Sequence, residues 1–269
     1  MDKKWNNSPR SSFNDRDEKY ERKEKDNSDI IFGLRAVIEA INSGREINKL
    51  MIQKGMQKEL FFELKEATAN KNYFIQFVPV ERLDRITTSN HQGVIAYLSP
   101  MEYANFEELV DKAVENEDKV CFLFLDRLTD VRNFGAIART AECQGVTAIV
   151  IPGKGSVQVT PDAIKTSAGA LNRIPVCKVG NLKDSLFYLQ QSGFRIVACT
   201  EKSSVPLYEV NLRGQVGIVM GSEEDGVSAD ILKMCDIKAR IPMRGEIASL
   251  NVGVATGMIL YERLRQELY

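Results

Sequence analysis

The carboxyl-terminal half of the chain alternates short apolar runs with patterns of helical spacing. Residues 120–125 (Val-Cys-Phe-Leu-Phe-Leu) are an unbroken apolar run, which predicts a strand buried on both faces. Further strands are predicted at 147–151, 174–179, 195–199 and 216–220, and helices at 134–144, 161–169, 182–192 and 228–235. A last amphipathic helix is predicted from Ser249 to Leu268, with one apolar face formed by Leu250, Val254, Met258, Tyr261, Leu264 and Leu268. This alternation is typical of an α/β domain with a parallel sheet.

A second, smaller α/β pattern covers residues 30–99. Apolar residues from Ile30 to Ile41 recur at helical spacing and stop at Asn42-Ser-Gly44, which predicts a helix. Strands are predicted at 47–52, 74–80 and 93–98, and helices at 57–70 and 82–86. Residues 100–119 hold two basic and seven acidic side chains and predict an acidic linker helix, with Phe106, Leu109, Val110 and Ala113 on one face.

Composition and charge narrow the possible classes of protein. With 269 residues, 43% of them hydrophobic, the chain can bury a core in each of two domains. Residues 1–29 carry eight basic and eight acidic side chains and almost no aliphatic ones, which predicts a disordered tail. The formal net charge of −1 argues against a protein that simply coats nucleic acid. Residues 30–99 (nine basic, seven acidic) and 120–269 (seventeen basic, fifteen acidic) are mildly positive, which permits an RNA site.

Cysteine spacing and hydropathy bear on location. The five cysteines, at positions 121, 143, 177, 199 and 235, lack the paired spacing of a zinc or redox site, so we expect no metal and reduced thiols in the cytoplasm. The chain opens without an apolar leader and contains no run of 18 apolar residues, so we expect neither export nor a membrane span.

Three stretches in the second half carry candidate chemistry: Asn133–Thr140, Gly217–Gly226 and Ile241–Val252. Asn133 is predicted to cap a helix, with Arg139 six residues later; a cap and a surface arginine are the ordinary interpretation. Glu223 lies in an acidic turn after a strand, where a solvated turn would look similar. Ser249 is predicted to cap the last helix, with Asn251, Gly253 and Gly257 inside it. Interior glycines destabilise a helix unless a ligand or another helix approaches closely.

Nucleotide-binding fingerprints are missing where an α/β fold would carry them. The residues after Leu125 do not form Gly-x-Gly-x-x-Gly, and no loop ends in Gly-Lys-Ser/Thr. Nicotinamide-dependent and phosphate-transfer functions therefore lose their main support.

In this order, the three stretches resemble the three motifs of the SpoU/TrmH (SPOUT) family of RNA ribose 2′-O-methyltransferases. The resemblance covers roughly residues 30–268, because Ile31–Val37 and Asn90–Val94 look like the family's substrate-binding domain. It implies an RNA-binding α/β domain at 30–99, a linker helix at 100–119 and a methyltransferase domain at 120–269 with a parallel sheet and a trefoil knot. It also implies a homodimer, RNA as the partner and S-adenosylmethionine as the methyl donor.

The resemblance assigns roles to individual residues. It implies catalytic roles for Asn133, Arg139, Glu223 and Asn251, and a methyl-donor site at Thr200, Met220, Gly221, Ile241 and Leu250. The family account makes the motif arginine the base, but a guanidinium with a pKa above about 12 stays protonated. We therefore expect Arg139 to bind a phosphate beside the target ribose, and Glu223 or water to accept the proton.

His91, the single histidine, is expected to be structural or to contact RNA rather than to act in catalysis. The expected reaction is methylation of a ribose 2′-hydroxyl, of a guanosine in 23S rRNA, since several transfer-RNA members of the family lack the amino-terminal domain. Three alternatives remain open: a tRNA 2′-O-methyltransferase of the same family, a non-catalytic RNA-binding ribosome-assembly factor, and a small-molecule α/β enzyme.

Overall fold

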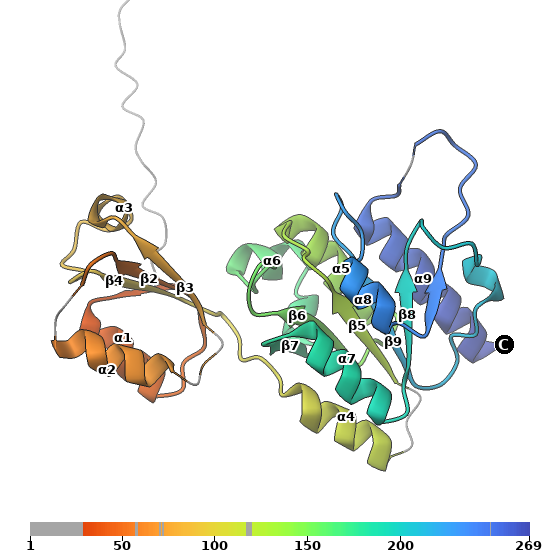
Figure 1. Cartoon of the computed structure of the whole chain (residues 1–269), viewed down its shortest axis with the longest axis horizontal. Helices are drawn as coiled ribbons and strands as arrows, with labels where there is room; N and C mark the ends of the chain where they lie inside the picture. The colour runs from red at the N-terminus through yellow and green to blue at the C-terminus, as the bar shows by residue number, and fades with distance from the viewer. Residues whose placement is uncertain (1–28, 57–58, 70, 72, 117–119, 248) are drawn as a thin grey trace, which may run out of the picture.

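The computed structural model describes residues 29–56, 59–69, 71, 73–116, 120–247 and 249–269. These residues form two lobes, each built around its own sheet (Figure 1). The amino-terminal lobe contains a four-stranded sheet and the carboxyl-terminal lobe a six-stranded one. The charged tail predicted at 1–29 lies, up to residue 28, outside the described residues.

The amino-terminal sheet is mixed. Its strands are β1 (Ile30–Phe32), β2 (Ile47–Gln53), β3 (Phe74–Val78) and β4 (Val94–Leu98), in the order β1-β4-β2-β3, with only β2 and β3 parallel. Helices α1 (Leu34–Asn42) and α2 (Glu59–Thr68) cover one face, and α3 (Val80–Asp84) lies on the other (Figure 1).

The helix predicted from Ile30 is wrong at its start, where β1 precedes α1. Gly33 separates the two elements with a φ of 92°, in the left-handed region that favours glycine. The break redirects the chain after Phe32, and residues 30–32 pair with β4 instead of joining the helix.

The carboxyl-terminal sheet is entirely parallel. Its strands are β5 (Cys121–Leu125), β6 (Ala148–Pro152), β7 (Val176–Val179), β8 (Arg195–Cys199), β9 (Val216–Met220) and β10 (Ile237–Ala239), in the order β10-β8-β9-β5-β6-β7. The strand β10, only three residues long, was not predicted. The chain runs outward from β5 to β7 and then crosses to β8, so the order reverses between β5 and β9. Parallel sheets bind ligands beyond the carboxyl ends of their strands at such a switch point.

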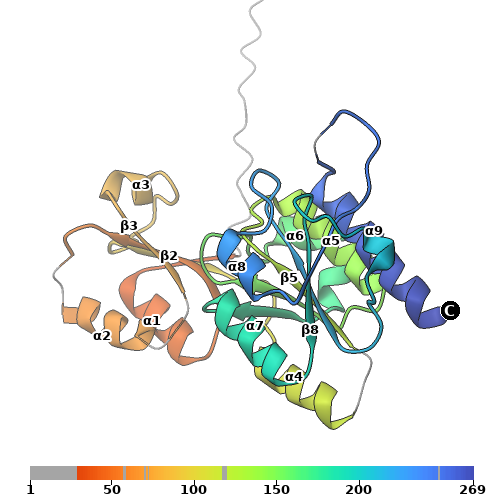
Figure 2. The ribbon, with the colours of Figure 1, turned by 45° about the vertical axis from the view of Figure 1, so that its right-hand side comes forward.

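Helices cover both faces of this sheet (Figure 2). One face carries α5 (Val131–Cys143), α6 (Pro161–Thr166) and α9 (Val252–Leu268), and the other carries α4 (Phe106–Glu115), α7 (Leu182–Gln191) and α8 (Ala229–Met234). Every residue of β5 is buried, as the unbroken apolar run predicted. The expected linker helix α4 is part of the core, because Phe106 packs edge-on against Phe122 and Phe124 with ring centroids 5.5 and 5.7 Å apart.

The apolar face predicted for the last helix is not the face that packs against the sheet. Val254, Met258, Tyr261 and Leu268 are exposed, whereas the buried side chains include Ile259 and Leu260. The periodicity is helical as predicted, but the chain itself does not cover this stripe.

Hydrogen bonds join the two lobes. The buried amide of Asn48 donates from Nδ2 to the Val159 carbonyl at 2.6 Å and accepts at Oδ1 from the Tyr103 hydroxyl at 2.8 Å. Lys178 Nζ donates to the Ile47 carbonyl at 3.1 Å and lies 5.0 Å from the Tyr103 ring centroid.

No helix in the described part of the chain is long and apolar enough to cross a membrane. The trefoil knot stays a prediction that follows from the resemblance.

Candidate active site

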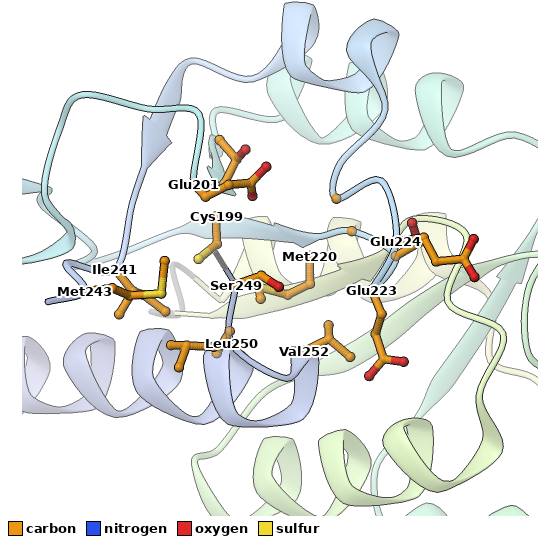
Figure 3. Close-up of a pocket in the computed structure, with 15 residues that line it drawn as sticks. Cys199, Glu201, Met220, Glu223, Glu224, Ile241, Met243, Ser249, Leu250 and Val252 are labelled. Carbon is orange, nitrogen blue, oxygen red and sulfur yellow. The ribbon is translucent and has the colours of Figure 1, made fainter. Parts of the chain in front are cut away.

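A cavity of about 250 Å³ opens beyond the carboxyl ends of β8 and β9 (Figure 3). The other side of the cavity is the segment from Ile241 to the first turn of α9. All five residues predicted for the methyl-donor site line it: Thr200, Met220, Gly221, Ile241 and Leu250. They come from three separate stretches of sequence, which the parallel sheet brings to one edge.

Gly221 begins a turn that no other residue would allow. A Cβ atom placed there would lie 2.0 Å from the Gly226 carbonyl carbon and 2.1 Å from the Val227 nitrogen. The turn closes through two backbone hydrogen bonds between Ser222 and Gly226, at 3.0 and 3.2 Å. Because the chain folds back directly onto Gly221, this turn can form a wall of the cavity without a side chain intervening.

Three of the four predicted catalytic residues meet beside the cavity. Asn133 Nδ2 and Asn251 Nδ2 both donate to Glu223 Oε1, the second at 2.9 Å, and Asn251 Nδ2 also donates to Asn133 Oδ1 at 3.1 Å. Figure 3 shows the Glu223 carboxylate turned toward the start of α9, while the Glu224 carboxylate points away. No partner is recorded for Glu223 Oε2 among the described residues, so one oxygen is anchored and the other is open.

Both predicted helix caps are wrong. The N-cap of α5 is Asp130, whose carboxylate accepts from the Arg132 and Asn133 amides at 2.7 and 3.0 Å, so Asn133 lies in the first turn with its side chain directed at Glu223. The N-cap of α9 is Asn251, whose Oδ1 accepts from the amides of Gly253 and Val254 at 3.0 and 3.3 Å. The predicted cap, Ser249, instead lines the cavity.

Small residues let α5 and α9 approach each other closely. A Cβ atom at Gly253 would lie 3.8 Å from the Ala136 Cβ, and one at Gly257 would lie 3.8 Å from the Thr140 Cγ2. On α5, Gly135 allows contact with α6, since a Cβ there would lie 2.6 Å from the Thr166 Cβ. A distance of 3.8 Å is an ordinary van der Waals contact, so the packing of α9 on α5 would also accommodate alanine at position 257, while Gly253 lies next to the cap.

Arg139 does not join this cluster within one chain. It lies six residues after Asn133 on α5, about 9 Å along the helix axis at 1.5 Å per residue. Its side chain is exposed and lines neither the cavity nor the neighbouring groove that Arg127 and Lys154 line.

A second hollow, a groove of about 490 Å³, shares Ser222, Glu223 and Glu224 with the cavity. Its charged lining residues are two cations, Arg127 and Lys154, and four carboxylates, Asp130, Glu223, Glu224 and Asp225. Glu223 thus lines both the cavity and the groove.

Arg127, which the sequence did not single out, holds the turn after β9. Its guanidinium donates from Nη1 to Asp225 Oδ2 and from Nη2 to the Gly226 carbonyl, each at 3.0 Å. Its φ of 57° lies in the left-handed region, which is unusual for a residue with a side chain. The neighbouring Asp126 is buried and accepts from the Ser228 amide at 2.7 Å. The one sequence signal for this pair was its position directly after a buried strand.

Other lining residues add to the chemistry of the cavity. Burial raises the pKa of the Cys199 thiol to about 12, so this side chain is neutral at pH 7 and forms part of the apolar wall. Glu201 and Met243 also line the cavity and were not predicted.

His91 has a structural role in the amino-terminal lobe. Its Nδ1 accepts from the Gly93 amide at 2.9 Å, which leaves the proton on Nε2 for the Asp84 carboxylate at 2.8 Å. The side chain is buried and holds the turn before β4.

Fold and site together define an α/β protein with a small-molecule cavity beyond the carboxyl ends of β8 and β9, next to the point where the strand order reverses. The SpoU rRNA methylase family matches residues 120–261, more than half of the chain. The chain belongs to this family of RNA methyltransferases. A second family, described as RNA 2′-O ribose methyltransferase substrate binding, matches residues 30–104.

Relatives extend over both lobes. A protein of Staphylococcus saprophyticus named as a TrmH family tRNA/rRNA methyltransferase is 38% identical over 240 residues, which cover 89% of this chain and 96% of that protein. The crystal structure of an AdoMet-bound rRNA methyltransferase from Sinorhizobium meliloti matches with a TM-score of 0.56 at 24% identity, over 88% of this chain and 86% of that one. A TrmH/SpoU tRNA-modifying enzyme of A. aeolicus matches with a TM-score of 0.51 at 33% identity, over 60% of this chain and 83% of that one.

Proposed function

We propose that this protein transfers a methyl group from S-adenosylmethionine to a ribose 2′-hydroxyl of RNA in the cytoplasm, and that its substrate is a guanosine of 23S rRNA. The single observation that carries the proposal is the position of Glu223, which borders both the cavity and the groove that Lys154 lines. A transfer reaction needs donor and acceptor in adjoining sites with a proton acceptor between them.

The cavity suits this donor chemically. Met220, Ile241 and Leu250 offer apolar surface for a purine, and the carboxylates of Glu201 and Glu223 lie where a sulfonium or ammonium charge would be stabilised. Its volume of about 250 Å³ is close to the lower end of small-molecule sites, roughly 300 Å³. The AdoMet-bound structure of the S. meliloti rRNA methyltransferase supports the assignment through a shared fold.

When bound, S-adenosylmethionine supplies an activated methyl group on a positively charged sulfur, so no metal is required. The protein must orient the ribose and remove a proton. Asn133 and Asn251 fix Oε1 of Glu223 by hydrogen bonds, which leaves Oε2 to accept the proton of the 2′-hydroxyl. Lys154, on the groove side, suits a phosphate that flanks the target ribose.

Arg139 requires a second copy of the chain if it acts at the site. We propose a homodimer through the exposed apolar stripe of α9 (Val254, Met258, Tyr261 and Leu268), which would carry Arg139 of one protomer toward the other's groove. In that position, the guanidinium would bind a phosphate and stabilise negative charge on the attacking oxygen.

The choice of ribosomal RNA rests on the two-lobed layout. The chain covers 96% of the S. saprophyticus relative, whose name mentions both tRNA and rRNA, so transfer RNA is the main alternative. A second alternative is a non-catalytic ribosome-assembly factor. It is disfavoured because Asn133, Glu223 and Asn251 are not only present but hydrogen-bonded together beside a cavity.

The test is transfer of labelled methyl from S-adenosylmethionine to total RNA of cells that lack the gene, followed by mapping of alkali-resistant linkages. We expect 2′-O-methylation of one guanosine in 23S rRNA by the wild type and none by Glu223→Gln. Label in transfer RNA would establish the first alternative. No transfer, together with no heat on titration with S-adenosylmethionine, would establish the second.

A further inference from the structure

The open part of the amino-terminal sheet carries two aromatic rings on either side of a lysine. Lys49 on β2 is the cross-strand neighbour of Phe74 on β3 and of Tyr97 on β4. Its Nζ lies 5.9 Å from both ring centroids. Phe74 is 36% exposed although it stands in a strand. The rings and the ammonium group therefore form a continuous surface across three strands.

A groove of about 740 Å³ lies between this surface and α3, which rests on the same face of the sheet, opposite α1 and α2 (Figure 1). Its charged lining residues are Lys49, Arg82, Arg85 and Glu81, three cations and one carboxylate, a net charge of +2. Leu83 of α3 packs into the small core under the groove with Met51, Val78 and Ile95, which anchors the helix that carries the two arginines.

The three cations outnumber the single carboxylate beside them, Glu81. No ion pair is recorded for Lys49, Arg82 or Arg85 within the described ranges. The pKa of Lys49 is lowered, first by burial and second by the positive charge of Arg82. Such repulsion destabilises the free protein and is relieved when an anion enters, so the groove favours a negatively charged ligand.

We propose that this groove, together with the Phe74 ring that lies beside it next to Lys49, binds an unpaired segment of the RNA substrate, with bases stacked on Phe74 and Tyr97 and phosphates on Lys49, Arg82 and Arg85. The inference rests on the proposed function and assigns a surface to substrate recognition. Unpaired bases expose flat faces that stack on aromatic side chains, whereas a duplex hides them. Cations spaced along the same groove track the backbone. The family described as substrate binding matches residues 30–104, which contain every residue of this surface.

The test uses the full-length protein and a labelled oligoadenylate roughly twelve nucleotides long, either single-stranded or annealed to oligouridylate. Phe74→Ala and Phe74→Leu are compared with Phe77→Ala, a matched control on the same strand that is 50% exposed on the opposite face. We expect both Phe74 variants to weaken single-strand binding by at least about fivefold, and Phe77→Ala to leave it within about twofold. Leucine keeps the apolar bulk of phenylalanine but lacks the flat ring. Weaker RNA binding by Phe74→Leu would therefore identify stacking as the source of the affinity.

The charge contribution has its own control. Lys49→Gln should reduce the slope of log K against log salt by roughly 0.7, the value for one phosphate contact on a single strand. Lys65→Gln, on α2 at the opposite face, should leave the slope unchanged.

Equal binding by the Phe74 and Phe77 variants, or equal affinity for the duplex and the single strand, would overturn the inference. Titration of the same preparations with S-adenosylmethionine keeps the two proposals apart. Phe74→Ala could lose affinity for RNA while neither the wild type nor any variant binds the donor. That outcome would contradict the proposed reaction but support the proposed RNA-binding surface.

Discussion

Asn251 Nδ2 donates a hydrogen bond to Asn133 Oδ1 at 3.1 Å, although 118 residues separate them along the chain. The same Asn251 side chain caps α9 through its oxygen and anchors Glu223 through its nitrogen. One amide thus ties the start of a helix to the proposed proton acceptor. The carboxyl-terminal helix and the turn after β9 therefore cannot move independently of the site.

Asn251→Ser is predicted to separate the two roles of this residue. Serine is as good an N-cap as asparagine, so stability should stay within about 0.5 kcal/mol, whereas Asn251→Ala should cost about 1 kcal/mol. Neither substitute donates to both Glu223 and Asn133, so methyl transfer should fall about 10- to 100-fold in both, the value of one hydrogen bond to a charged group. Urea unfolding and single-turnover rates measure the two effects. Full activity of Asn251→Ser would remove the anchoring role.

Gly221→Ala is predicted to abolish binding of the methyl donor. Its Cβ would overlap the backbone of Gly226 and Val227, so the turn that lines the cavity must open. Calorimetric titration with S-adenosylmethionine should show at least a tenfold weaker affinity, about 1.4 kcal/mol. Gly245→Ala is the matched control, because Gly245 lies two residues after the lining residue Met243 without lining the cavity itself, and its Cβ would meet nothing within 4 Å. Similar losses in both variants would contradict the account.

Arg127→Gln is predicted to act through the turn rather than on the reacting atoms. Losing its bonds to Asp225 and Gly226 should raise KM for the donor about tenfold, with a smaller effect on kcat. Arg127→Lys should restore only part of the affinity, because a single ammonium does not reproduce the two-pronged contact. Arg132→Gln, an exposed arginine nearby, serves as the control. A fall in kcat with unchanged KM would place Arg127 in the chemistry instead.

The link between the lobes is predicted to respond to pH. Burial lowers the pKa of the Lys178 ammonium to about 8, against the opposing effect of Glu46. Between pH 8 and the ordinary lysine value, the unfolded chain keeps a proton that the folded protein has lost, so stability contributed by this group rises with pH. Below pH 8 both states are charged and the contribution is constant.

Lys178→Met keeps the apolar stem and removes the titration. Urea unfolding of both proteins at pH 7, 8 and 9 should show a wild-type free energy of unfolding that increases relative to the variant only above pH 8. A difference that is constant over this range would mean that Lys178 titrates normally.

Met258→Glu is predicted to dissociate the proposed dimer. Met258 is 44% exposed in the middle of the apolar stripe of α9, so a charge there leaves the fold of the protomer intact but disfavours its burial against a second copy. Sedimentation velocity should show a dimer for the wild type and a monomer for the variant. A wild type that sediments as a monomer would contradict the dimer.

A mixing experiment then tests where Arg139 acts. Arg139→Ala and Glu223→Gln, each inactive alone, should recover about a quarter of wild-type activity when randomly mixed, if the two groups come from different protomers of a dimer. No recovery in mixed dimers would place both groups in the same protomer.

The sequence predicted the sheets better than the ends of the helices. The unbroken apolar run through β5 predicted a buried strand by itself, because a strand that is buried on both faces has apolar side chains at every position. The caps failed because several acceptors compete near each helix start. Asp130 lies three residues before Asn133 and takes the capping role, and Asn251 takes it in place of Ser249.

The resemblance named residues that lie around one cavity, but the sequence did not predict how they are arranged. The five residues that the resemblance assigned to the methyl donor, Thr200, Met220, Gly221, Ile241 and Leu250, all border one cavity. Arg127 was missed because its role depends on a turn 98 residues away. The stripe with Met258 and Tyr261 shows the limit of periodicity, which indicates an apolar face but not what covers it.

A crystal structure with S-adenosylhomocysteine tests the central claim most directly. We predict that the product occupies the cavity between Gly221 and Leu250, with its sulfur directed toward the cluster formed by Asn133, Glu223 and Asn251. Density for the product elsewhere on the molecule, or a cavity left empty at saturating concentration, would contradict it.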